Sequence, residues 1–250
     1  MKYLPFLSSV HALVRPDRYL EIGIRNGVSL SLANCKVVGI DPAYNLTAEV
    51  DNHVSLFRTT SDEYFSRPEP LAVTGGEPFD MAFIDGMHLF EFALRDFINT
   101  EKHARSSSVV IFDDVLPRNV DEAARDRHTI GWTGDVFRVI EVLARYRPEV
   151  VTILVDTQPT GLFIVAGLDP TSSVLEDHYD EIMAEFRRPD PQPVPQDILD
   201  RAAVQPPHRV LGATFWKVIA EERSDPAPQE FHSRLREQLT VDFGDAYARS

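Results

Sequence analysis

Short apolar runs that end at a glycine or an acidic residue recur along the first two thirds of the chain. These runs are rich in Val, Ile, Leu and Phe, which is typical of buried strands. The predicted strands are residues 19–22, 36–40, 54–58, 79–84 and 109–112. Two later runs, 150–155 and 162–166, are joined by the turn Gln158-Pro159-Thr160-Gly161. So short a connection predicts an antiparallel pair, because parallel strands need a long crossover.

Segments with helical spacing of apolar residues alternate with these strands. Helices are predicted at residues 4–14, 89–103 and 136–146, with a further helix that opens at 28–33. A short helix is predicted to be capped by Ser61-Asp62-Glu63, and residues 68–78 are expected to form a surface loop. Strand–helix units followed by an antiparallel hairpin predict an α/β fold. The expected sheet is Rossmann-like, mostly parallel with its last strand antiparallel, and has helices on both faces.

The character of the chain changes after Leu168. Further helices are predicted at 173–186, 213–222 and 229–239, and alternate prolines at 187–195 favour an extended, semi-rigid spacer. We therefore divide the chain into a domain at 1–168 and a C-terminal extension at 169–250. The extension is either a loosely packed tail or a functional segment, namely a lid or a contact between subunits of a homo-oligomer.

Composition narrows the classes of partner. The chain has 250 residues and a formal net charge of −14, which argues against nucleic acid or an anionic membrane as its main partner. Its single cysteine, Cys35, excludes an intrachain disulfide framework and is expected to be a core residue. No apolar run approaches membrane-spanning length, and residues 1–7 do not form a convincing signal peptide. We expect a reducing, cytoplasmic setting.

A glycine-containing turn follows the first predicted strand. In Glu21-Ile22-Gly23-Ile24-Arg25-Asn26-Gly27, the strand ends at Gly23 and a helix opens after Gly27. Such a turn presents free backbone N–H groups to a ligand, and glycine lets the ligand approach the backbone. Arg25 stands where a dinucleotide site needs its middle glycine, so a close pyrophosphate is not expected. The carboxylate of Glu21 suits a ligand that carries an ammonium group. The alternative is that the glycines serve strand–helix packing alone.

The second predicted strand also ends in an acid. Asp41 follows residues 36–40 and lies 18 residues after Gly23. A carboxylate in this place can accept hydrogen bonds from both hydroxyls of a ribose. The pattern E-x-G-x-x-x-G followed by an acid-ended strand resembles the class I S-adenosylmethionine-dependent methyltransferases, which implies that S-adenosylmethionine is the cofactor.

Three more acids end the fourth and fifth predicted strands. They are Asp85, Asp113 and Asp114, and the carboxyl ends of neighbouring parallel strands meet at one edge of a sheet. Clustered carboxylates repel one another unless a cation joins them, and oxygen ligands suit Mg²⁺ or another hard divalent ion. His88 follows Asp85 by three residues, on the first turn of the next predicted helix, and is a candidate general base. A helix-capping or surface histidine is the alternative.

These residues resemble the metal-dependent O-methyltransferases of the catechol type and of natural-product sugars, over about residues 19–167. The sugar type matches better in two segments, Asp85-Gly86-Met87-His88 and Phe112-Asp113-Asp114. The catechol type has a lysine at the position of His88. The resemblance implies that Glu21 and Gly23 hold the methionyl part of the cofactor, with Gly27 in the same turn. It also implies that Asp41 binds the ribose, that Ser61 binds the adenine edge, and that Asp85 lies at both the cofactor and the metal.

The sequence therefore predicts a Mg²⁺-dependent O-methyltransferase that acts on a hydroxyl of a small molecule, and the resemblance to the sugar type implies that this is a sugar or natural-product glycoside. Its catalytic base is expected to be His88, and its metal ligands Asp85, Asp113 and Asp114. Trp132 is expected either to stack on the acceptor ring or to pack in the core. Two alternatives stay open: a metal-independent methyltransferase, and a non-catalytic protein of the same fold that binds S-adenosylmethionine.

Overall fold

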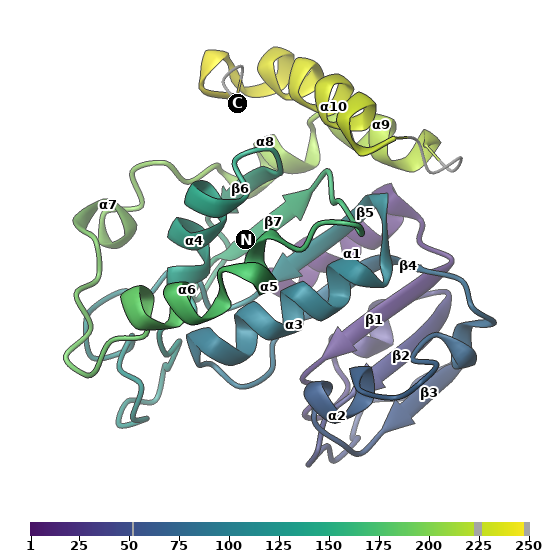
Figure 1. Cartoon of the computed structure of the whole chain (residues 1–250), viewed down its shortest axis with the longest axis horizontal. Helices are drawn as coiled ribbons and strands as arrows, with labels where there is room; N and C mark the ends of the chain where they lie inside the picture. Colours follow the sequence, from purple (N-terminus) through teal and green to yellow (C-terminus); the bar gives the residue numbers. More distant parts are fainter. Residues whose placement is uncertain (52, 223–226, 248–250) are drawn as a thin grey trace.

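The computed structural model describes residues 1–51, 53–222 and 227–247. A seven-stranded sheet with the order β3-β2-β1-β4-β5-β7-β6 forms its centre (Figure 1). The strands are β1 (Arg18–Ile22), β2 (Lys36–Ile40), β3 (Val54–Phe57), β4 (Phe79–Ile84), β5 (Ala104–Phe112), β6 (Val151–Val155) and β7 (Leu162–Ala166). Strands β1 to β5 are parallel, whereas β7 is antiparallel to both β5 and β6. The predicted fold class is confirmed.

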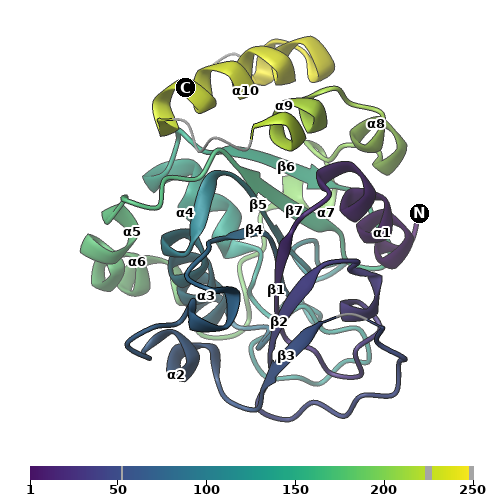
Figure 2. The ribbon, with the colours of Figure 1, turned by 90° about the vertical axis from the view of Figure 1, so that its right-hand side faces the viewer.

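Helices cover both faces of the sheet, which Figure 2 shows nearly edge-on. One face carries α2 (Ser61–Phe65), α3 (Phe90–Lys102), α4 (Arg138–Tyr146), α5 (Val174–Asp177) and α6 (Tyr179–Phe186). The other face carries α1 (Tyr3–Val14), α8 (Pro207–Leu211), α9 (Phe215–Glu221) and α10 (Pro228–Phe243). Each face has its own apolar core, because successive side chains of a strand point to opposite sides. Leu20 and Ile22 of β1 therefore lie in the first core, and Tyr19 in the second.

Several predicted elements need correction. Residues 28–33 do not form a helix: a single 3₁₀ turn at Leu30–Leu32 is followed by extended backbone at Ala33. The connection must return to β2 at Lys36, which leaves no room for a helix after the glycine turn. The helix predicted at 173–186 is two helices, α5 and α6, and the cap of α2 is Thr60, one residue before the predicted one.

The loop at 68–78 contains a 3₁₀ turn, Ala72–Thr74, and three short elements of the C-terminal extension were not predicted. These are α7 (Gln196–Leu199), α8 and a 3₁₀ turn at Asp245–Tyr247. Each is only one turn or slightly more, and α7 and α8 begin directly after prolines. Elements this short carry too little periodicity to be recognised in a sequence.

The helices of the extension contribute large side chains to the second core. Phe215 and Trp216 of α9 and Phe231, Leu235 and Leu239 of α10 are buried against the sheet or against α1. Figure 1 shows α9 and α10 lying together over one end of the sheet. Among the described residues, no helix is both long and apolar enough to cross a membrane.

The proline-rich segment is anchored to the long loop that follows β5. The Asp190 carboxylate accepts hydrogen bonds from the backbone N–H groups of Arg125 and Asp126, at 3.0 and 3.2 Å. Gln192 Oε1 accepts from the Arg138 guanidinium at 3.1 Å, and this glutamine is buried. Residues 187–195 thus form a strap that Asp190 and Gln192 hold against the loop at 113–137 and against α4, while Pro189, Pro191 and Pro193 are exposed.

Candidate active site

The carboxyl ends of β1, β2, β4 and β5 open into one cavity of about 640 Å³. This volume lies within the range of roughly 300–1,000 Å³ that is typical of small-molecule sites. Six of the predicted site residues line the cavity together with His88: Gly23, Asp41, Ser61, Asp85, Asp113 and Asp114. Parallel strands bring these side chains together because their carboxyl ends share one edge of the sheet.

The turn after β1 is held against two neighbouring strand ends. Gly23 has a φ of +91°, and a Cβ at this position would lie 2.0 Å from the backbone oxygen of Asp85. Only glycine fits there. One carboxylate oxygen of Asp41 accepts hydrogen bonds from the N–H groups of Ile24 and Arg25, at 2.9 and 2.8 Å. The other oxygen accepts from the N–H of Ala43 at 2.6 Å, so Asp41 fixes the turn, lines the cavity and keeps one lone pair for a ligand.

Glu21 and Gly27 lie beneath the cavity and are not among its lining residues. The Glu21 side chain is fully buried, and its carboxyl accepts hydrogen bonds from Tyr19 Oη at 2.8 Å and Ser29 Oγ at 2.7 Å. Burial raises the pKa of Glu21 to about 8, against the opposing effect of these two hydrogen bonds. Gly27 has a φ of +81°, and a Cβ there would lie 2.6 Å from the side chain of Leu46. In this structure both residues support the turn from below.

We predict that Glu21→Gln changes the pH dependence of folding stability. The folded chain holds one more proton than the unfolded chain between the unfolded pKa of 4.5 and the folded pKa of about 8. Wild-type stability therefore falls as the pH rises through this window, by on the order of 4 kcal/mol for this group. Glutamine is nearly isosteric and uncharged, so the variant should gain stability relative to the wild type between pH 5 and pH 9.

Urea denaturation at pH 5 and pH 9 measures this difference. Glu237→Gln, at an exposed position on α10, serves as the matched control and should leave the pH dependence unchanged. An equal effect of Glu21→Gln at both pH values would contradict the burial of an uncharged carboxyl at this position.

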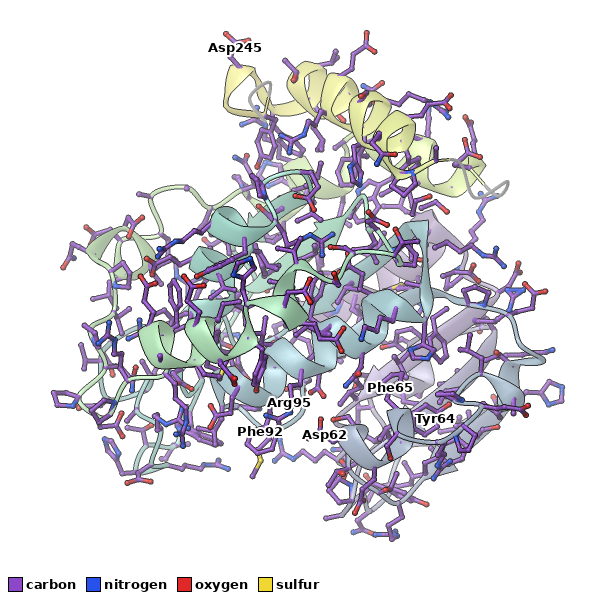
Figure 3. All side chains as sticks on the ribbon, viewed as in Figure 1. Asp62, Tyr64, Phe65, Phe92, Arg95 and Asp245 are labelled. Carbon is purple, nitrogen blue, oxygen red and sulfur yellow. The ribbon has the colours of Figure 1, made fainter. Side chains whose placement is uncertain are left out.

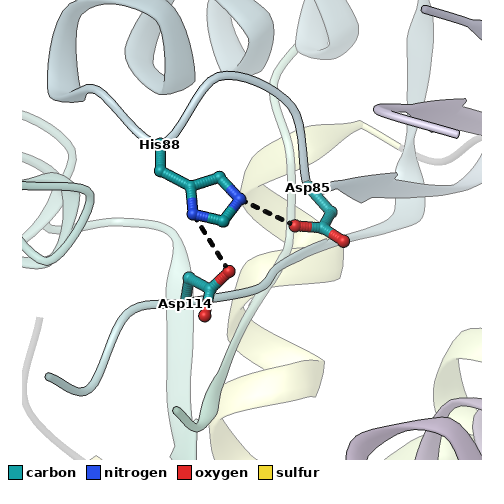
Figure 4. Close-up of side chains that lie close together, drawn as sticks. All are labelled: Asp85, His88 and Asp114. Carbon is teal, nitrogen blue, oxygen red and sulfur yellow. Dashed lines mark ion pairs between the residues drawn. The ribbon is translucent and has the colours of Figure 1, made fainter. Parts of the chain in front are cut away.

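His88 lies between two of the acids (Figure 4). Its Nε2 is 3.3 Å from an oxygen of Asp85, and its Nδ1 is 3.3 Å from an oxygen of Asp114. Ligand atoms of these three residues all lie within 4.8 Å of one another, which is close enough to hold a metal ion. Asp113 is more deeply buried, and one of its oxygens accepts from the N–H of Asp114 at 2.9 Å. His88 itself belongs to the loop before α3, not to the first turn of that helix as predicted.

The four charged groups perturb one another. Burial, together with the charges of Asp114 and Asp85, raises the pKa of Asp113 well above its usual range. Burial also raises the pKa of Asp114 to about 6, although the nearby His88 opposes this. For His88, burial acts to lower the pKa, but the Asp85 hydrogen bond and the two negative charges outweigh it and raise the pKa to about 9. Such mutual perturbation is typical of functional sites.

A tryptophan orients the histidine. The rings of His88 and Trp132 are stacked, with centroids 5.0 Å apart and an interplanar angle of 16°. The Trp132 carbonyl oxygen lies 2.8 Å from His88 Nδ1. Because a carbonyl oxygen can only accept, Nδ1 carries the proton and Nε2 is the nitrogen that faces Asp85. The Trp132 indole N–H donates to the Ala124 carbonyl at 2.7 Å, which anchors the loop.

Sequence patterns did not single out several residues of the cavity wall as site residues. Thr160, from the turn before β7, donates a hydrogen bond to Asp114 at 2.5 Å. Tyr3, from α1, lines the same cavity, and its burial and the surrounding acids raise the pKa of its hydroxyl. Asp96 reaches the wall from the buried side of α3. Its position in the turn between two predicted strands is a usable signal for Thr160, whereas nothing local marks Tyr3 and Asp96 as site residues.

The sheet order, the glycine turn and the acid-ended strands define a methyltransferase-type domain. Residues 20–115 match the family model described as a methyltransferase domain. This segment runs from β1 through β5 and includes Gly23, Asp41, Asp85 and Asp113. The resemblance to class I methyltransferases is confirmed, and with it the prediction of a methyltransferase enzyme. No curated protein matches the chain.

Solved structures with the same fold share little sequence with this chain. Cofactor-bound Rv0187 from MTB is 19% identical with a TM-score of 0.50, and the match covers 66% of this chain and 78% of that one. The O-methyltransferase from Bacillus cereus in complex with SAH is 19% identical with a TM-score of 0.47, covering 66% and 80%. The O-methyltransferase TomG from Streptomyces achromogenes, in complex with SAM, is 24% identical with a TM-score of 0.45, covering 66% and 78%. At this identity, the match to Rv0187 supports the fold alone.

Proposed function

We propose that this chain is an O-methyltransferase that uses S-adenosylmethionine and Mg²⁺, or another hard divalent cation, to methylate a hydroxyl of a small molecule. The observation that carries the proposal is the cluster of Asp85, His88 and Asp114, which lines the same cavity as the Gly23 turn and Asp41. A nucleoside-type subsite and a cation-type subsite thus meet in one cavity. As predicted from the sequence, we propose that the acceptor is a sugar or natural-product glycoside.

The cavity suits the cofactor in shape and in chemistry. Gly23 removes the Cβ that would block approach to the turn, and Asp41 has acceptor capacity left for ribose hydroxyls. Ser61 and Asp85 line the wall beside them. We propose that these residues hold the cofactor. Glu21 and Gly27 would act through the turn that they support.

The acids suit a hard divalent cation. Asp85 and Asp114 each direct an oxygen toward His88, and Asp113 stands behind them with a strongly raised pKa. Oxygen ligands of this kind are those that Mg²⁺ prefers. We propose Asp85, Asp113 and Asp114 as its ligands.

The cofactor, when bound, supplies a methyl group already activated by the sulfonium. The residues of the chain have to align an acceptor hydroxyl with it and take the hydroxyl proton. The Trp132 carbonyl holds the Nδ1 proton of His88, so Nε2 is the atom that receives the acceptor proton. When the charges of Asp85 and Asp114 are offset by a cation, the pKa of His88 falls toward neutrality, where a general base is most effective.

We propose that the C-terminal extension supports the site through contacts outside the cavity. Its strap, residues 187–195, holds the loop that carries Arg125 and Trp132 through Asp190, and it contacts α4 through Gln192 and Arg138. We propose that 1–168 is the methyltransferase domain and that 169–250 stabilises the acceptor side, with a role in joining subunits as a further part of the hypothesis. The single cysteine and the acidic composition fit a cytoplasmic enzyme that does not act on nucleic acid.

Binding of S-adenosylhomocysteine, the product form of the cofactor, tests the cofactor site. Asp41→Ala should weaken binding by about 1.5–3 kcal/mol, since it removes hydrogen bonds to a charged group. Isothermal titration calorimetry measures the affinity, and thermal unfolding checks that the variant is folded. Asp180→Ala, at an exposed position on α6, is the control and should bind like the wild type. Unchanged affinity in Asp41→Ala would contradict the assignment of Asp41 to the cofactor site.

Two other functions make different predictions. A metal-independent methyltransferase would be fully active in excess chelator. A non-catalytic protein of this fold would bind S-adenosylhomocysteine but would not methylate any hydroxylated acceptor. A non-catalytic protein would not need an aligned histidine between two aspartates in the cavity.

A further inference from the structure

Arg127 is a cation in the cavity wall that the mechanism above does not use. It lies in the loop at 113–137, is exposed, and lines the cavity together with Ile130 and Trp132 of the same loop. The Cζ atom of its guanidinium lies 5.6 Å from the centroid of the Trp132 ring. Because Trp132 stacks on His88, the positive charge of Arg127 belongs to the side of the cavity that holds the proposed base.

The other two arginines of this loop have carboxylate partners. Arg118 forms an ion pair with Glu122, and Arg125 forms one with Glu91. Within the described ranges of the chain, the Arg127 guanidinium forms neither a hydrogen bond nor an ion pair, and its contact with a ring is a cation–π contact. The donors of Arg127 are therefore available to a ligand in the cavity.

The acids of the cavity wall are directed to other partners. Asp62 accepts hydrogen bonds from Arg95, through Nε at 3.0 Å and through a terminal nitrogen at 2.9 Å. Figure 3 shows these two side chains close together between α2 and α3. Two acids of the proposed metal site each direct an oxygen toward His88. An anion that pairs with Arg127 would thus come from the ligand.

A carboxylate is the anion that suits this cavity best. The planar guanidinium of arginine can bind both oxygens of a carboxylate at once. A carboxylate carries one negative charge, whereas a phosphate monoester carries nearly two at neutral pH. Nearby acids repel the doubly charged group more strongly. Among the described residues that line the cavity, six are aspartates: Asp41, Asp62, Asp85, Asp96, Asp113 and Asp114.

Apolar side chains at the cavity indicate the other part of the ligand. Ile130, in the same loop as Arg127, is 100% exposed, and Met87, next to His88 in the chain, is 56% exposed. Both line the cavity. A ligand that covers these side chains removes apolar surface from water, which favours binding. A charged group for Arg127 and an apolar group for Ile130 and Met87 describe an amphipathic acceptor.

We propose that the acceptor is an acidic sugar, a uronic acid joined to an apolar group, and that Arg127 binds its carboxylate. Arg127 would hold the acid group while a hydroxyl of the same sugar faces His88. This inference rests on the proposed methylation of a glycoside and narrows its substrate class. It makes Arg127 a specificity-determining residue on the acceptor side of the cavity.

Calorimetry with three glycosides tests this substrate class, on protein loaded with S-adenosylhomocysteine and Mg²⁺. Phenyl β-D-glucuronide should bind the wild type about ten- to a hundredfold more tightly than phenyl β-D-glucoside, in which a hydroxymethyl group replaces the carboxylate. Phenyl β-D-glucoside 6-phosphate should bind more weakly than the glucuronide, because the surrounding aspartates repel its second charge.

Variants test whether Arg127 is the group that reads the carboxylate. Arg127→Gln should lower the affinity for the glucuronide to that for the glucoside and leave the affinity for the glucoside unchanged. Arg127→Lys keeps the charge without the planar fork, so an intermediate preference is expected. Lys36→Gln is the control, because it removes one positive charge at the exposed amino end of β2, at the opposite edge of the sheet from the cavity. This control should keep the wild-type preference.

The outcomes separate the inference from the function on which it rests. A wild type that does not bind S-adenosylhomocysteine contradicts the proposed function and the inference with it. A wild type that binds S-adenosylhomocysteine but binds the glucuronide no better than the glucoside, or binds the phosphate more tightly, overturns the inference alone. These measurements do not depend on any variant being folded.

Two results with Arg127→Gln would also overturn the inference. Equal weakening of both phenyl glycosides would make Arg127 a structural support of Trp132, since the loss would not depend on the charge of the ligand. Weaker binding of S-adenosylhomocysteine would assign Arg127 to the carboxylate of the cofactor instead of the acceptor.

Discussion

Excess EDTA is expected to abolish methyl transfer by this protein, and added Mg²⁺ to restore it. Asp85, Asp113 and Asp114 are brought together at two adjacent strand ends, and two of them have pKa values raised by burial and by mutual repulsion. A bound cation removes this repulsion, so the acids should bind one strongly. Without it, the raised pKa of His88, about 9, leaves this histidine protonated at neutral pH and unable to accept a proton. Turnover measured in EDTA and in a Mg²⁺ titration tests the expectation.

Variants divide the roles within the cluster. Asp114→Ala and Asp113→Ala should lose cation binding, measured by calorimetry with Mg²⁺, together with turnover. His88→Ala should keep cation and cofactor binding but lose roughly two to four orders of magnitude in rate, the usual range for a general base. Loss of Mg²⁺ binding in His88→Ala would make the histidine a ligand instead. Full activity in EDTA would refute the metal role altogether.

The strand ends could be located from the sequence because the pattern there is local. Asp41, Asp85, Asp113 and Asp114 each follow a short apolar run directly, and parallel strands place such residues at one edge. The spacing from Asp85 to His88 likewise survives in the structure as a contact at 3.3 Å. The sequence pattern therefore predicted which acids lie at the carboxyl edge of the sheet.

How deeply each acid is buried beside the cavity could not be predicted in the same way. Glu21 is adjacent to the strand end, yet it lies on the opposite side of β1 from Leu20 and Ile22 and is covered by Tyr19 and Ser29. Asp96 falls within the helix predicted at 89–103, and only the packing of α3 against the sheet brings this residue to the cavity wall. These placements depend on tertiary contacts, which carry no local signal.

The C-terminal extension was the least predictable part. Its prolines predicted an extended, semi-rigid spacer, but they gave no indication that Asp190 binds the loop after β5 and that Gln192 binds Arg138 of α4. Helices α9 and α10 were expected near their observed positions, but their apolar residues gave no indication of which surface they cover. In the structure they pack with α1 over the sheet, as Figure 2 shows.

Removing α8, α9 and α10 by ending the chain after Val204 is expected to destroy cooperative folding. The deletion would expose apolar residues of β5 and β6 in the second core, such as Ile111 and Ile153, because α9 and α10 contact these strands. A single substitution in α9 should also reduce folding stability, by a smaller amount. Trp216 is 1% exposed, and its indole N–H donates to the Val210 carbonyl at 2.8 Å. Trp216→Ala should cost about 3–5 kcal/mol, the usual loss for a large aromatic side chain in a core.

Urea denaturation followed by circular dichroism measures both effects. Val241→Ala, at a position on α10 that is 75% exposed, is the control and should change stability by less than about 0.5 kcal/mol. The shortened chain should lose its near-ultraviolet signal and its sharp unfolding transition, because β5 and β6 would lose the helices that cover them on one face. A truncated chain that unfolds cooperatively at the wild-type midpoint would show that residues 205–250 are dispensable for folding.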